Sequence, residues 1–445
     1  MLKSIAIDSV IYLMNLAYSA YKSISSGLFV SLFPPFWLYS RITGKYRKSV
    51  HQRIGLYPQE LISSVSGSPR IWIHAVSVGE VNVAVPIIES LQEMMPTASV
   101  ILSTATEQGQ ALAKEKLDTA ATCLYAPVDF IYSVRHALKR FQPDILVCIE
   151  TEIWPNWLIE ANRAGAKTAL INGRISVRSI RRYLKIVPLM REILRHVDAF
   201  SMIGKADVER ILKMGAPENR IEINGNAKFD LLLLQTDPAV KADMMQRFNL
   251  NGKQPVFVAG STRGPEAKIV LDVYEKIIRS FPEAILIIAP RHLKRAGQIG
   301  DEVRLRGLTC ELMTELDGNA APRSAPIVIL DTIGELHSTY SIATVVFCGG
   351  SLVPLGGQNV FEAAVWGKPV LYGPSMEDFL DAKELLDKTG GGIQVQDGSD
   401  LADKALFCLN HPEKAERIGL RAREAVLSHQ GAAQKHAAVI KKLLD

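Results

Sequence analysis

The feature that most constrains this chain is a pair of similar strand–loop–helix motifs, one in each half of the sequence. The first is IWIHAVSVGE at residues 71–80, and the second is VVFCGGSLVPLGGQNVFEA at residues 345–363. In each motif an apolar strand leads into glycine and small polar residues, then into a helix start that carries a carboxylate, Glu80 or Glu362. Glycine lets a backbone approach a ligand closely, and a helix N-terminus offers free N–H groups. The two motifs together predict two nucleotide-binding-type domains that face each other across a cleft.

Short apolar runs alternate with helix-length amphipathic stretches from residue 70 onward. Strands are predicted at 71–75, 99–104, 145–149, 168–172, 198–203 and 221–224, and again at 255–260, 284–289, 327–330, 344–348 and 369–372. Continuous rather than alternating apolar strands indicate parallel sheets covered on both faces, so the predicted fold class is α/β. Pro86 is expected near a helix start, which places that start close to Gly79 and Glu80.

The predicted organisation is an N-terminal segment followed by two domains. Residues 1–50 form the segment, residues 51–235 the first domain and residues 236–445 the second. The last helical stretch, about 414–444, has no strand after it and is a candidate to pack back across the first domain.

The excess positive charge lies in the N-terminal segment. Residues 1–53 contain seven basic residues and one acid, which leaves 44 basic against 45 acidic residues in the rest of the chain. A nucleic-acid-binding protein is expected to spread basic charge over its folded surface, so this function is disfavoured. The apolar runs Ile5–Ala20 and Gly27–Tyr39, followed by Arg41, Lys45, Arg47, Lys48 and Arg53, favour a membrane anchor or interfacial helix, with the body of the protein in the cytoplasm. A cleaved signal peptide and a buried core helix are the alternatives.

Three motifs of the first half carry groups suited to chemistry. Glu80 ends HAVSVGE in a predicted first helical turn, where the helix dipole stabilises a carboxylate that can act as a general base; a capping acid is the alternative interpretation. Glu150 and Glu152 follow a strand in CIETEIWPNW, where open α/β sheets bind ligands, although strand-end surface acids are as common. Lys228 lies in GNAKFD, and the tryptophans of CIETEIWPNW are expected to pack rather than to stack on a ligand.

In the second half, three further strand ends are predicted to converge on one sheet edge. APRH places Arg291 and His292 after a strand, and DTIGEL does the same for Gly334 and Glu335. GGQNVFE then places Asn359 and Glu362 in a first helical turn, where a glutamate can bond ribose hydroxyls while loop amides meet phosphate.

Several motifs are missing from the sequence. No GxxxxGK[ST] sequence, strict GxGxxG or Asp-x-Asp occurs, and the His and Cys spacing offers no zinc site. Metal-assisted chemistry and a redox dinucleotide enzyme are therefore disfavoured, and no metal site is predicted. The five cysteines form no CxxC pair and are expected to be reduced.

Taken together, the motifs resemble the 3-deoxy-D-manno-octulosonic acid (Kdo) transferases of lipopolysaccharide synthesis. HAVSVGE, ETEIWPN, INGRIS, GNAKFD, PRH, DTIGEL and GGSLVPLGGQNVFEAA occur in the family's order between about residues 40 and 425. The resemblance implies a GT-B fold, two Rossmann-like domains with the acceptor bound by the first and the sugar nucleotide by the second. It also implies CMP-Kdo as donor, no cofactor, the tetra-acyldisaccharide 1,4'-bisphosphate precursor of lipid A as acceptor, and a location at the cytoplasmic face of the inner membrane.

The same resemblance implies roles for individual residues. Glu80 matches the family's general base, and Glu150 and Lys228 match residues assigned to transition-state stabilisation. The segments that would contact CMP contain Pro290, Arg291, His292, Ile333, Gly334, Glu335, Asn359, Val360, Phe361 and Glu362. Position 333 is often methionine and position 358 often histidine in this family, so Ile333 and Gln358 depart from its pattern.

Two other functions remain open at this point. One is another GT-B enzyme, either a nucleotide-sugar transferase or an epimerase, and the other is an inactive membrane-tethered scaffold. The sequence leaves open the number and linkage of Kdo residues added, the mode of anchoring and the oligomeric state.

Overall fold

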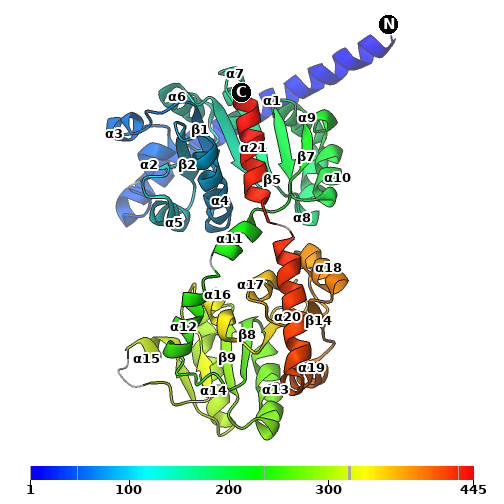
Figure 1. The fold of residues 1–445 in the computed structure, drawn as a ribbon. Helices are drawn as coiled ribbons and strands as arrows, with labels where there is room; N and C mark the ends of the chain where they lie inside the picture. The colour runs from blue at the N-terminus through cyan, green and yellow to red at the C-terminus, as the bar shows by residue number, and fades with distance from the viewer. Residues whose placement is uncertain (1, 48, 235, 319–321, 429) are drawn as a thin grey trace. The chain divides into compact units, whose positions relative to one another are not determined.

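The chain folds into two compact α/β units (Figure 1). The computed structural model describes residues 2–47, 49–234, 236–318, 322–428 and 430–445. The first unit contains Met1–Leu231 and Gly431–Asp445, and the second contains Leu232–Gln430. The division thus falls slightly before the expected boundary at residue 235. The C-terminal segment from Gly431 belongs to the first unit, in agreement with the last helical stretch as a candidate to pack back on it.

The first unit is built on a seven-stranded parallel sheet. Its strand order is β3-β2-β1-β4-β5-β6-β7. The strands are β1 (Arg70–His74), β2 (Ser99–Thr104), β3 (Thr122–Tyr125), β4 (Ile145–Ile149), β5 (Lys167–Gly173), β6 (Ala199–Met202) and β7 (Ile221–Ile223). Its helices are α1 (Leu2–Thr43), α2 (Val50–Arg53), α3 (Gln59–Ser63), α4 (Val78–Met94), α5 (Glu107–Leu117), α6 (Ile131–Phe141), α7 (Pro155–Arg163), α8 (Val177–Tyr183), α9 (Val187–Leu194), α10 (Lys205–Met214) and α21 (Ala432–Leu444).

The second unit repeats this architecture. Its seven parallel strands have the order β10-β11-β9-β8-β12-β13-β14. They are β8 (Val256–Thr262), β9 (Ile285–Pro290), β10 (Cys310–Leu312), β11 (Ile327–Ile329), β12 (Val345–Cys348), β13 (Val370–Tyr372) and β14 (Gly392–Gln394). Its helices are α12 (Pro238–Arg247), α13 (Glu266–Ser280), α14 (Ala296–Leu305), α15 (Met313–Gly318), α16 (Leu336–Thr339), α17 (Phe361–Ala364), α18 (Leu380–Thr389), α19 (Gly398–Asn410) and α20 (Pro412–Leu427), while α11 (Lys228–Leu234) spans the division between the units.

The predicted α/β class and its parallel sheets are confirmed. The continuous apolar runs form the central strands, and every residue of β4 is buried because helices cover both faces of the sheet. Three strands were not predicted: β3, β10 and β14. All three lie at sheet edges, where a strand has one neighbour and less buried surface, so their sequences carry weaker apolar patterns.

Helix α21 completes the first unit although it is the last element of the chain. Asp230 caps its start by accepting hydrogen bonds from the backbone N–H groups of Gly431 and Ala433, both at 2.7 Å. Its buried His436 bonds the Ser201 hydroxyl at 2.7 Å and the Gly225 carbonyl at 3.1 Å. The predicted helical stretch 414–444 is therefore two helices, of which α20 remains in the second unit.

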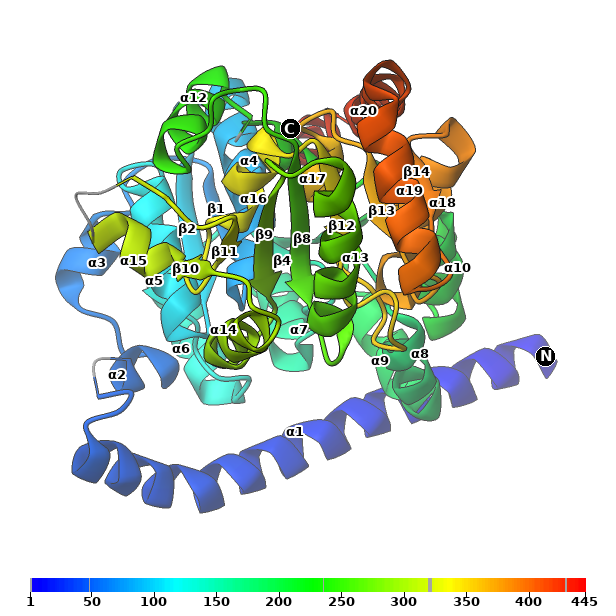
Figure 2. The ribbon, with the colours of Figure 1, turned by 90° about the horizontal axis from the view of Figure 1, so that it is seen from below.

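The N-terminal helix α1 runs along one side of the first unit and packs against α9 (Figure 2). Pro34 and Pro35 lie inside this helix. Pro86 likewise lies well inside α4, although that helix begins at Val78, close to the predicted start. Among the described residues, no helix combines the length and the apolarity needed to cross a membrane.

Candidate functional site

Glu80 lies in the first turn of α4, directly after β1. It is 8% exposed, and its Oε2 accepts hydrogen bonds from the backbone N–H of Ser77 at 2.7 Å and from the Ser77 hydroxyl at 3.2 Å. Glu80 therefore caps the start of α4, as the alternative interpretation predicted. Because Ser77 engages only Oε2, these bonds leave Oε1 of the carboxyl for other partners.

The environment of Glu80 makes its carboxyl unusually basic. Burial raises its pKa to about 7, with a further contribution from the carboxylate of Glu152 and a smaller one from Glu150. The N–H of Ser77 acts in the opposite direction because it stabilises the ionised form. A carboxyl that titrates near neutral pH is suited to accept a proton from a substrate hydroxyl.

Glu150 and Lys228 form an ion pair beside this turn. Their Oε1 and Nζ atoms are 2.6 Å apart, and the two side chains are 14% and 35% exposed. Glu150 follows β4 in the left-handed conformation, with φ of 57°. Residues outside glycine rarely adopt this conformation, and such strain is common at functional sites. The sequence placed both residues in the site, and the structure brings them together.

Asparagine side chains bring three sequence motifs to the same edge of the sheet. Asn172 of INGRIS accepts a hydrogen bond from the N–H of Ala227 at 2.9 Å, and Asn226 accepts one from the N–H of Lys228 at 3.1 Å. Lys228, at the start of α11, thereby reaches Glu150 of ETEIWPN at the end of β4. Since all strands are parallel, their carboxyl ends share one edge, which is where open α/β sheets bind ligands.

The tryptophans of ETEIWPNW mainly pack, as the sequence suggested. Trp157 is 1% exposed and stacks on the buried ring of His74 at 4.8 Å. Trp154 packs edge-on against His74 at 4.9 Å, and its Nε1–H donates a hydrogen bond to Oε2 of Glu152 at 2.5 Å. This donor to Glu152 is a feature that sequence reasoning missed.

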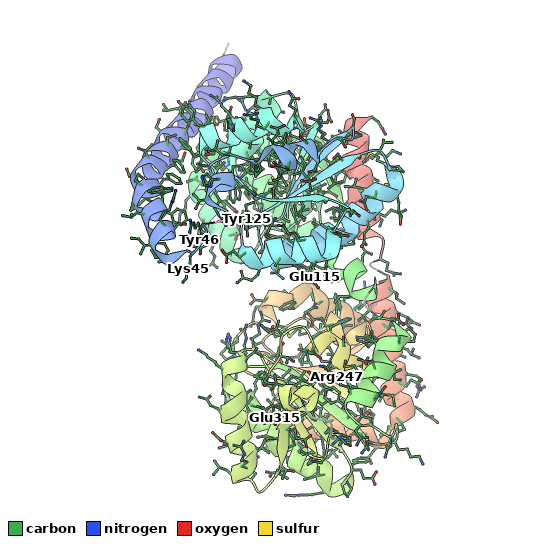
Figure 3. All side chains as sticks on the ribbon, turned by 90° about the vertical axis from the view of Figure 1, so that its left-hand side faces the viewer. Lys45, Tyr46, Glu115, Tyr125, Arg247 and Glu315 are labelled. Atoms are coloured by element: carbon green, nitrogen blue, oxygen red, sulfur yellow. The ribbon has the colours of Figure 1, made fainter. Side chains whose placement is uncertain are left out.

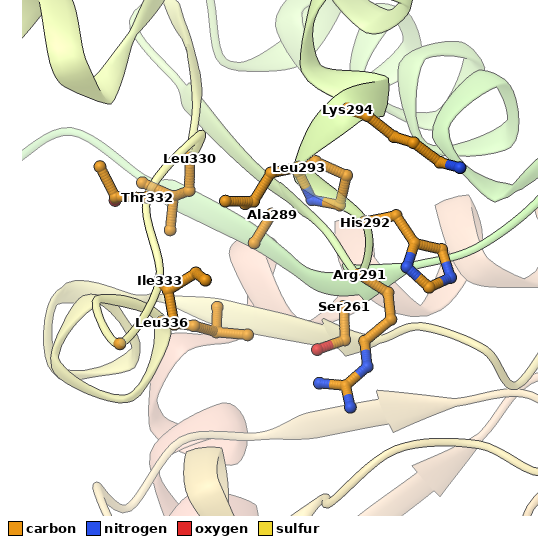
Figure 4. A pocket seen from close by; sticks show the side chains of 12 residues that line it. Ser261, Ala289, Arg291, His292, Leu293, Lys294, Leu330, Thr332, Ile333 and Leu336 are labelled. Carbon is orange, nitrogen blue, oxygen red and sulfur yellow. The ribbon is translucent and has the colours of Figure 1, made fainter. Parts of the chain in front are cut away.

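A cavity of about 510 Å³ lies in the second unit at the carboxyl ends of β9 and β11 (Figure 4). Five of the predicted donor-contacting residues line it: Pro290, Arg291, His292, Ile333 and Gly334. Ser261, near the carboxyl end of β8, also lines it and was not predicted. The volume is within the range of small-molecule sites.

Glu335 is not among the residues that line this cavity, and its carboxylate is already paired. Arg247 of α12 donates to both of its oxygens, at 2.6 and 3.1 Å. The same guanidinium donates to both carboxylate oxygens of Asp317, at 2.8 and 2.6 Å. Arg247 is labelled in Figure 3. It lies far from Glu335 in the sequence, so sequence analysis did not reveal this contact.

The glycine-rich loop after β12 differs from the expected phosphate cradle. Glu266 is fully buried, and its carboxylate accepts hydrogen bonds from the N–H groups of Gly350 at 2.6 Å, Ser351 at 3.0 Å and Leu352 at 2.9 Å. It also accepts from the N–H of Arg263 at 2.8 Å. The N–H groups of Gly350, Ser351 and Leu352 are therefore already hydrogen-bonded. They cannot donate to a phosphate while Glu266 accepts from them.

The segment Asn359–Glu362 lies beside the cavity rather than in its lining. The Asn359 side-chain amide donates to Oε1 of Glu362 at 3.3 Å. Burial raises the pKa of Glu362, whereas Asn359 and the nearby charge of Arg291 lower it, so Arg291 links this carboxyl to the cavity. Val360 and Phe361 are 0% and 1% exposed, so both residues are buried.

Two further expectations concern metals and cysteines. No group of three or more His, Cys, Asp or Glu side chains that could hold a metal ion occurs in the described part of the chain. All five cysteines are free thiols, and Cys148, Cys348 and Cys408 are buried.

Comparison with known proteins identifies the relatives of this chain. A family model described as 3-deoxy-D-manno-octulosonic-acid transferase matches residues 48–231. The 3-deoxy-D-manno-octulosonic acid transferase of Haemophilus influenzae is 28% identical over 408 residues, which cover 90% of this chain and 92% of that protein. The corresponding enzyme of Chlamydia pneumoniae is 27% identical and covers 87% of each chain. A bifunctional glycosyltransferase/methyltransferase of Fusobacterium nucleatum is 33% identical over 80% of this chain, which spans only 54% of that longer protein.

Solved structures share the fold of the chain at low identity. The UDP-GlcNAc 2-epimerase of Neisseria meningitidis has a TM-score of 0.59 at 13% identity and covers 84% of this chain and 99% of its own. A glycosyltransferase of Rickettsia africae has a TM-score of 0.58 at 13% identity, covering 84% of this chain and 98% of its own. At this identity the likeness shows the fold alone, which is the predicted GT-B fold of glycosyltransferases and epimerases.

Proposed function

We propose that the chain, as a member of the Kdo transferase family of glycosyltransferases, transfers Kdo from CMP-Kdo to the tetra-acyldisaccharide 1,4'-bisphosphate precursor of lipid A. The observation that carries the proposal is the buried carboxyl of Glu80 beside the Glu150–Lys228 ion pair, where burial raises the pKa of Glu80 to about 7. An acceptor hydroxyl is a very weak acid, so a nearby base of raised pKa is what its activation requires.

In the proposed reaction, Glu80 accepts the proton of an acceptor hydroxyl as its oxygen attacks the anomeric carbon of Kdo. CMP leaves from the opposite face, so configuration inverts in one displacement. Lys228, held 2.6 Å from Glu150, supplies positive charge to stabilise the negative charge that develops during transfer. A preorganised charge of this kind contributes roughly 3–4 kcal/mol in well-studied enzymes.

We propose that the cavity of the second unit holds the CMP moiety and that no divalent metal takes part. Arg291 lines the cavity, and its guanidinium can pair with the single phosphate of CMP in a bidentate manner. Its electrostatic link to Glu362 brings a carboxylate near the same ligand, where it can accept hydrogen bonds from ribose hydroxyls. Treatment with a chelator should leave activity intact; complete loss that only a divalent ion restores would overturn this part.

The test of the proposed function is Glu80→Gln in a transfer assay with CMP-Kdo and the lipid A precursor. The amide keeps the size of the side chain but cannot accept a proton, so transfer should fall by at least about 10²-fold. CMP binding, measured by calorimetry, should be unchanged. Near-normal turnover of the variant would remove Glu80 as the base, and competition by UDP rather than CMP would favour a different nucleotide-sugar enzyme.

We propose further that α1 lies on the cytoplasmic face of the inner membrane. Tyr18 and Tyr21 fix the helix to the first unit, through hydrogen bonds of 3.1 Å to Asn156 and 2.6 Å to Asp129. Beyond them the helix exposes a run of large apolar side chains, namely Ile24, Leu28, Val30, Leu32, Trp37, Leu38, Tyr39 and Ile42. Such a surface is unfavourable in water and typical of helices that lie in a membrane interface.

Basic residues at the end of α1 support this orientation. The Arg41 guanidinium lies 4.8 Å from the Trp37 ring, and Lys45 and Arg47 are exposed, whereas Lys48 lies outside the described residues. Figure 3 shows Lys45 and Tyr46 at this end of the helix. Each basic residue near an anionic surface contributes about 1 kcal/mol to binding.

Vesicle binding of the full chain tests this orientation. Replacing Arg41, Lys45 and Arg47 by glutamine should weaken binding to anionic vesicles, more at low salt than at high salt. Replacing the exposed Lys268, Lys276 and Arg279 of α13 is the matched control. Equal effects of the two triple variants would refute the proposed orientation.

A further inference from the structure

Glu152 is an acidic residue of the site that takes no part in the reaction proposed for Glu80, Glu150 and Lys228. It follows β4 on the same loop as Glu150, and its side-chain carboxyl is hydrogen-bonded to the carboxyl of Glu80. Two ionised carboxylates have only acceptor atoms, so they cannot form a hydrogen bond with each other. This contact therefore requires one proton between the two groups.

Each member of the pair has its own fixed donor. The backbone N–H of Ser77 donates to Oε2 of Glu80 at 2.7 Å, and the indole N–H of Trp154 donates to Oε2 of Glu152 at 2.5 Å. Both donors stabilise the ionised form of the carboxyl they contact. Their balance, together with the neighbouring charges, decides which of the two groups carries the shared proton.

The other titratable groups around the pair come from several elements. Glu150 adds negative charge to both carboxyls and is itself neutralised by Lys228. Tyr183 of α8 faces Glu152 and has Arg182 beside it. The remaining neighbours, buried His74 and Cys148, are neutral near pH 7, because burial lowers the pKa of His74 to about 4 and raises that of Cys148.

We propose that Glu152 is a positioning residue of the transfer reaction, which shares a single proton with Glu80 and thereby sets the pH at which Glu80 can act as the base. The proposal rests on the function proposed above. When the proton resides on Glu152, Glu80 is ionised and receives a hydrogen bond from its partner. When the proton resides on Glu80, the base is blocked.

The proton balance of the reaction follows from this pair. Before transfer, the pair holds one proton and Glu80 is the ionised member. As the acceptor oxygen forms its bond to the anomeric carbon, its proton moves to Glu80, and the bond from that carbon to the phosphate oxygen breaks with both electrons leaving on CMP. The pair then holds two protons, one of which returns to solvent before the next turnover. The raised pKa of Glu80, caused first by burial and then by Glu152, agrees with a pair that retains a proton near neutrality.

The test is the pH profile of kcat/KM in three variants of the full-length enzyme. Glu152→Gln cannot take up the proton and removes a negative neighbour, so the acidic limb should move to lower pH by about one unit or more. Trp154→Phe keeps the aromatic packing but removes the donor of Glu152, which favours the proton on Glu152 and should move the limb in the same direction. Glu89→Gln, an exposed charge on the same helix as Glu80, is the control and should leave the limb in place.

A second measurement needs no substrate and therefore separates this proposal from the proposed function. Infrared titration of the carboxyl C=O band should show a group that titrates near neutral pH in the wild type, absent from Glu80→Gln and moved to lower pH in Glu152→Gln. Absence of transfer in the wild type, with this band present, would refute the proposed function alone. If neither Glu152→Gln nor Trp154→Phe moves the acidic limb of the pH profile or the infrared carboxyl band, the proton-sharing pair is refuted. If Glu152→Gln fails to fold, Trp154→Phe decides the question.

Discussion

Replacement of Glu266 by glutamine is the perturbation whose consequence follows most directly from the structure. Its fully buried carboxylate accepts four backbone N–H groups, those of Arg263, Gly350, Ser351 and Leu352, at distances between 2.6 and 3.0 Å. The arrangement joins the turn after β8 to the loop after β12. We expect Glu266→Gln to loosen this loop while the sheet remains folded.

The magnitude follows from the number of bonds lost. Glutamine offers one acceptor oxygen in place of two, and its NH2 group faces the N–H groups that the other oxygen served. Two N–H groups therefore lose a charged acceptor, at about 1.5 kcal/mol or more each, so local opening becomes easier by about 3 kcal/mol. Since 1.36 kcal/mol corresponds to about a tenfold change, exchange through local opening should accelerate roughly 10²-fold.

Hydrogen exchange followed by mass spectrometry measures this effect locally, without assuming that a two-unit chain unfolds in one step. The readout is exchange in peptides that contain residues 350–352, compared with peptides from β9 as an internal reference. Glu283→Gln, an exposed residue of the same unit, is the matched control and should exchange like the wild type. Acceleration of less than about threefold in Glu266→Gln would refute the argument that this carboxylate holds the loop.

Two further predictions concern buried and paired charges. Burial lowers the pKa of His436 to about 4, so the folded state rejects a proton that the unfolded state binds below about pH 6.5. Stability should therefore fall by up to about 3 kcal/mol between pH 6.5 and 4. His436→Gln has no titrating ring and should remove this part of the pH dependence. Denaturation midpoints of His436→Gln that fall with pH as steeply as those of the wild type would contradict this prediction. Arg247→Lys loses the fork that orients Glu335 and should weaken CMP binding several-fold by calorimetry, whereas Asp317→Asn, which leaves the Glu335 pair intact, should not. Equal effects of these two variants on CMP binding would contradict a role of the Arg247–Glu335 pair in binding.

Much of the candidate site could be predicted because the fold places strand ends together. A parallel sheet collects the residues that follow its strands at one edge, so Glu150 after β4 and Lys228 near the end of the domain were predictable as members of one site. The donor segments at 290–292 and 333–334 were predictable for the same reason, since β9 and β11 are neighbours in the sheet. In these cases the end of the preceding strand is enough to place a residue at the site, without knowledge of its side-chain contacts.

Contacts between side chains distant in sequence were not predictable in this way. The loop after β12 has the composition of a phosphate-binding loop, but Glu266, more than eighty residues earlier, already holds its first amides. Arg247 pairs with Glu335 over a similar separation. The carboxyl pair of Glu80 and Glu152 also depends on how the ends of β1 and β4 approach each other.

The amino-acid sequence by itself determined the α/β class, the central strands and the helix starts near Glu80 and Glu362, because apolar periodicity and capping residues act over a few positions. Only the tertiary structure decided the edge strands β3, β10 and β14, the return of α21 to the first unit and the partners of each buried carboxylate. These depend on burial, which is set by everything that surrounds a group rather than by its neighbours in the chain. A buried charge must find a donor, a counter-charge or a proton, and which of these it finds is a property of the folded molecule.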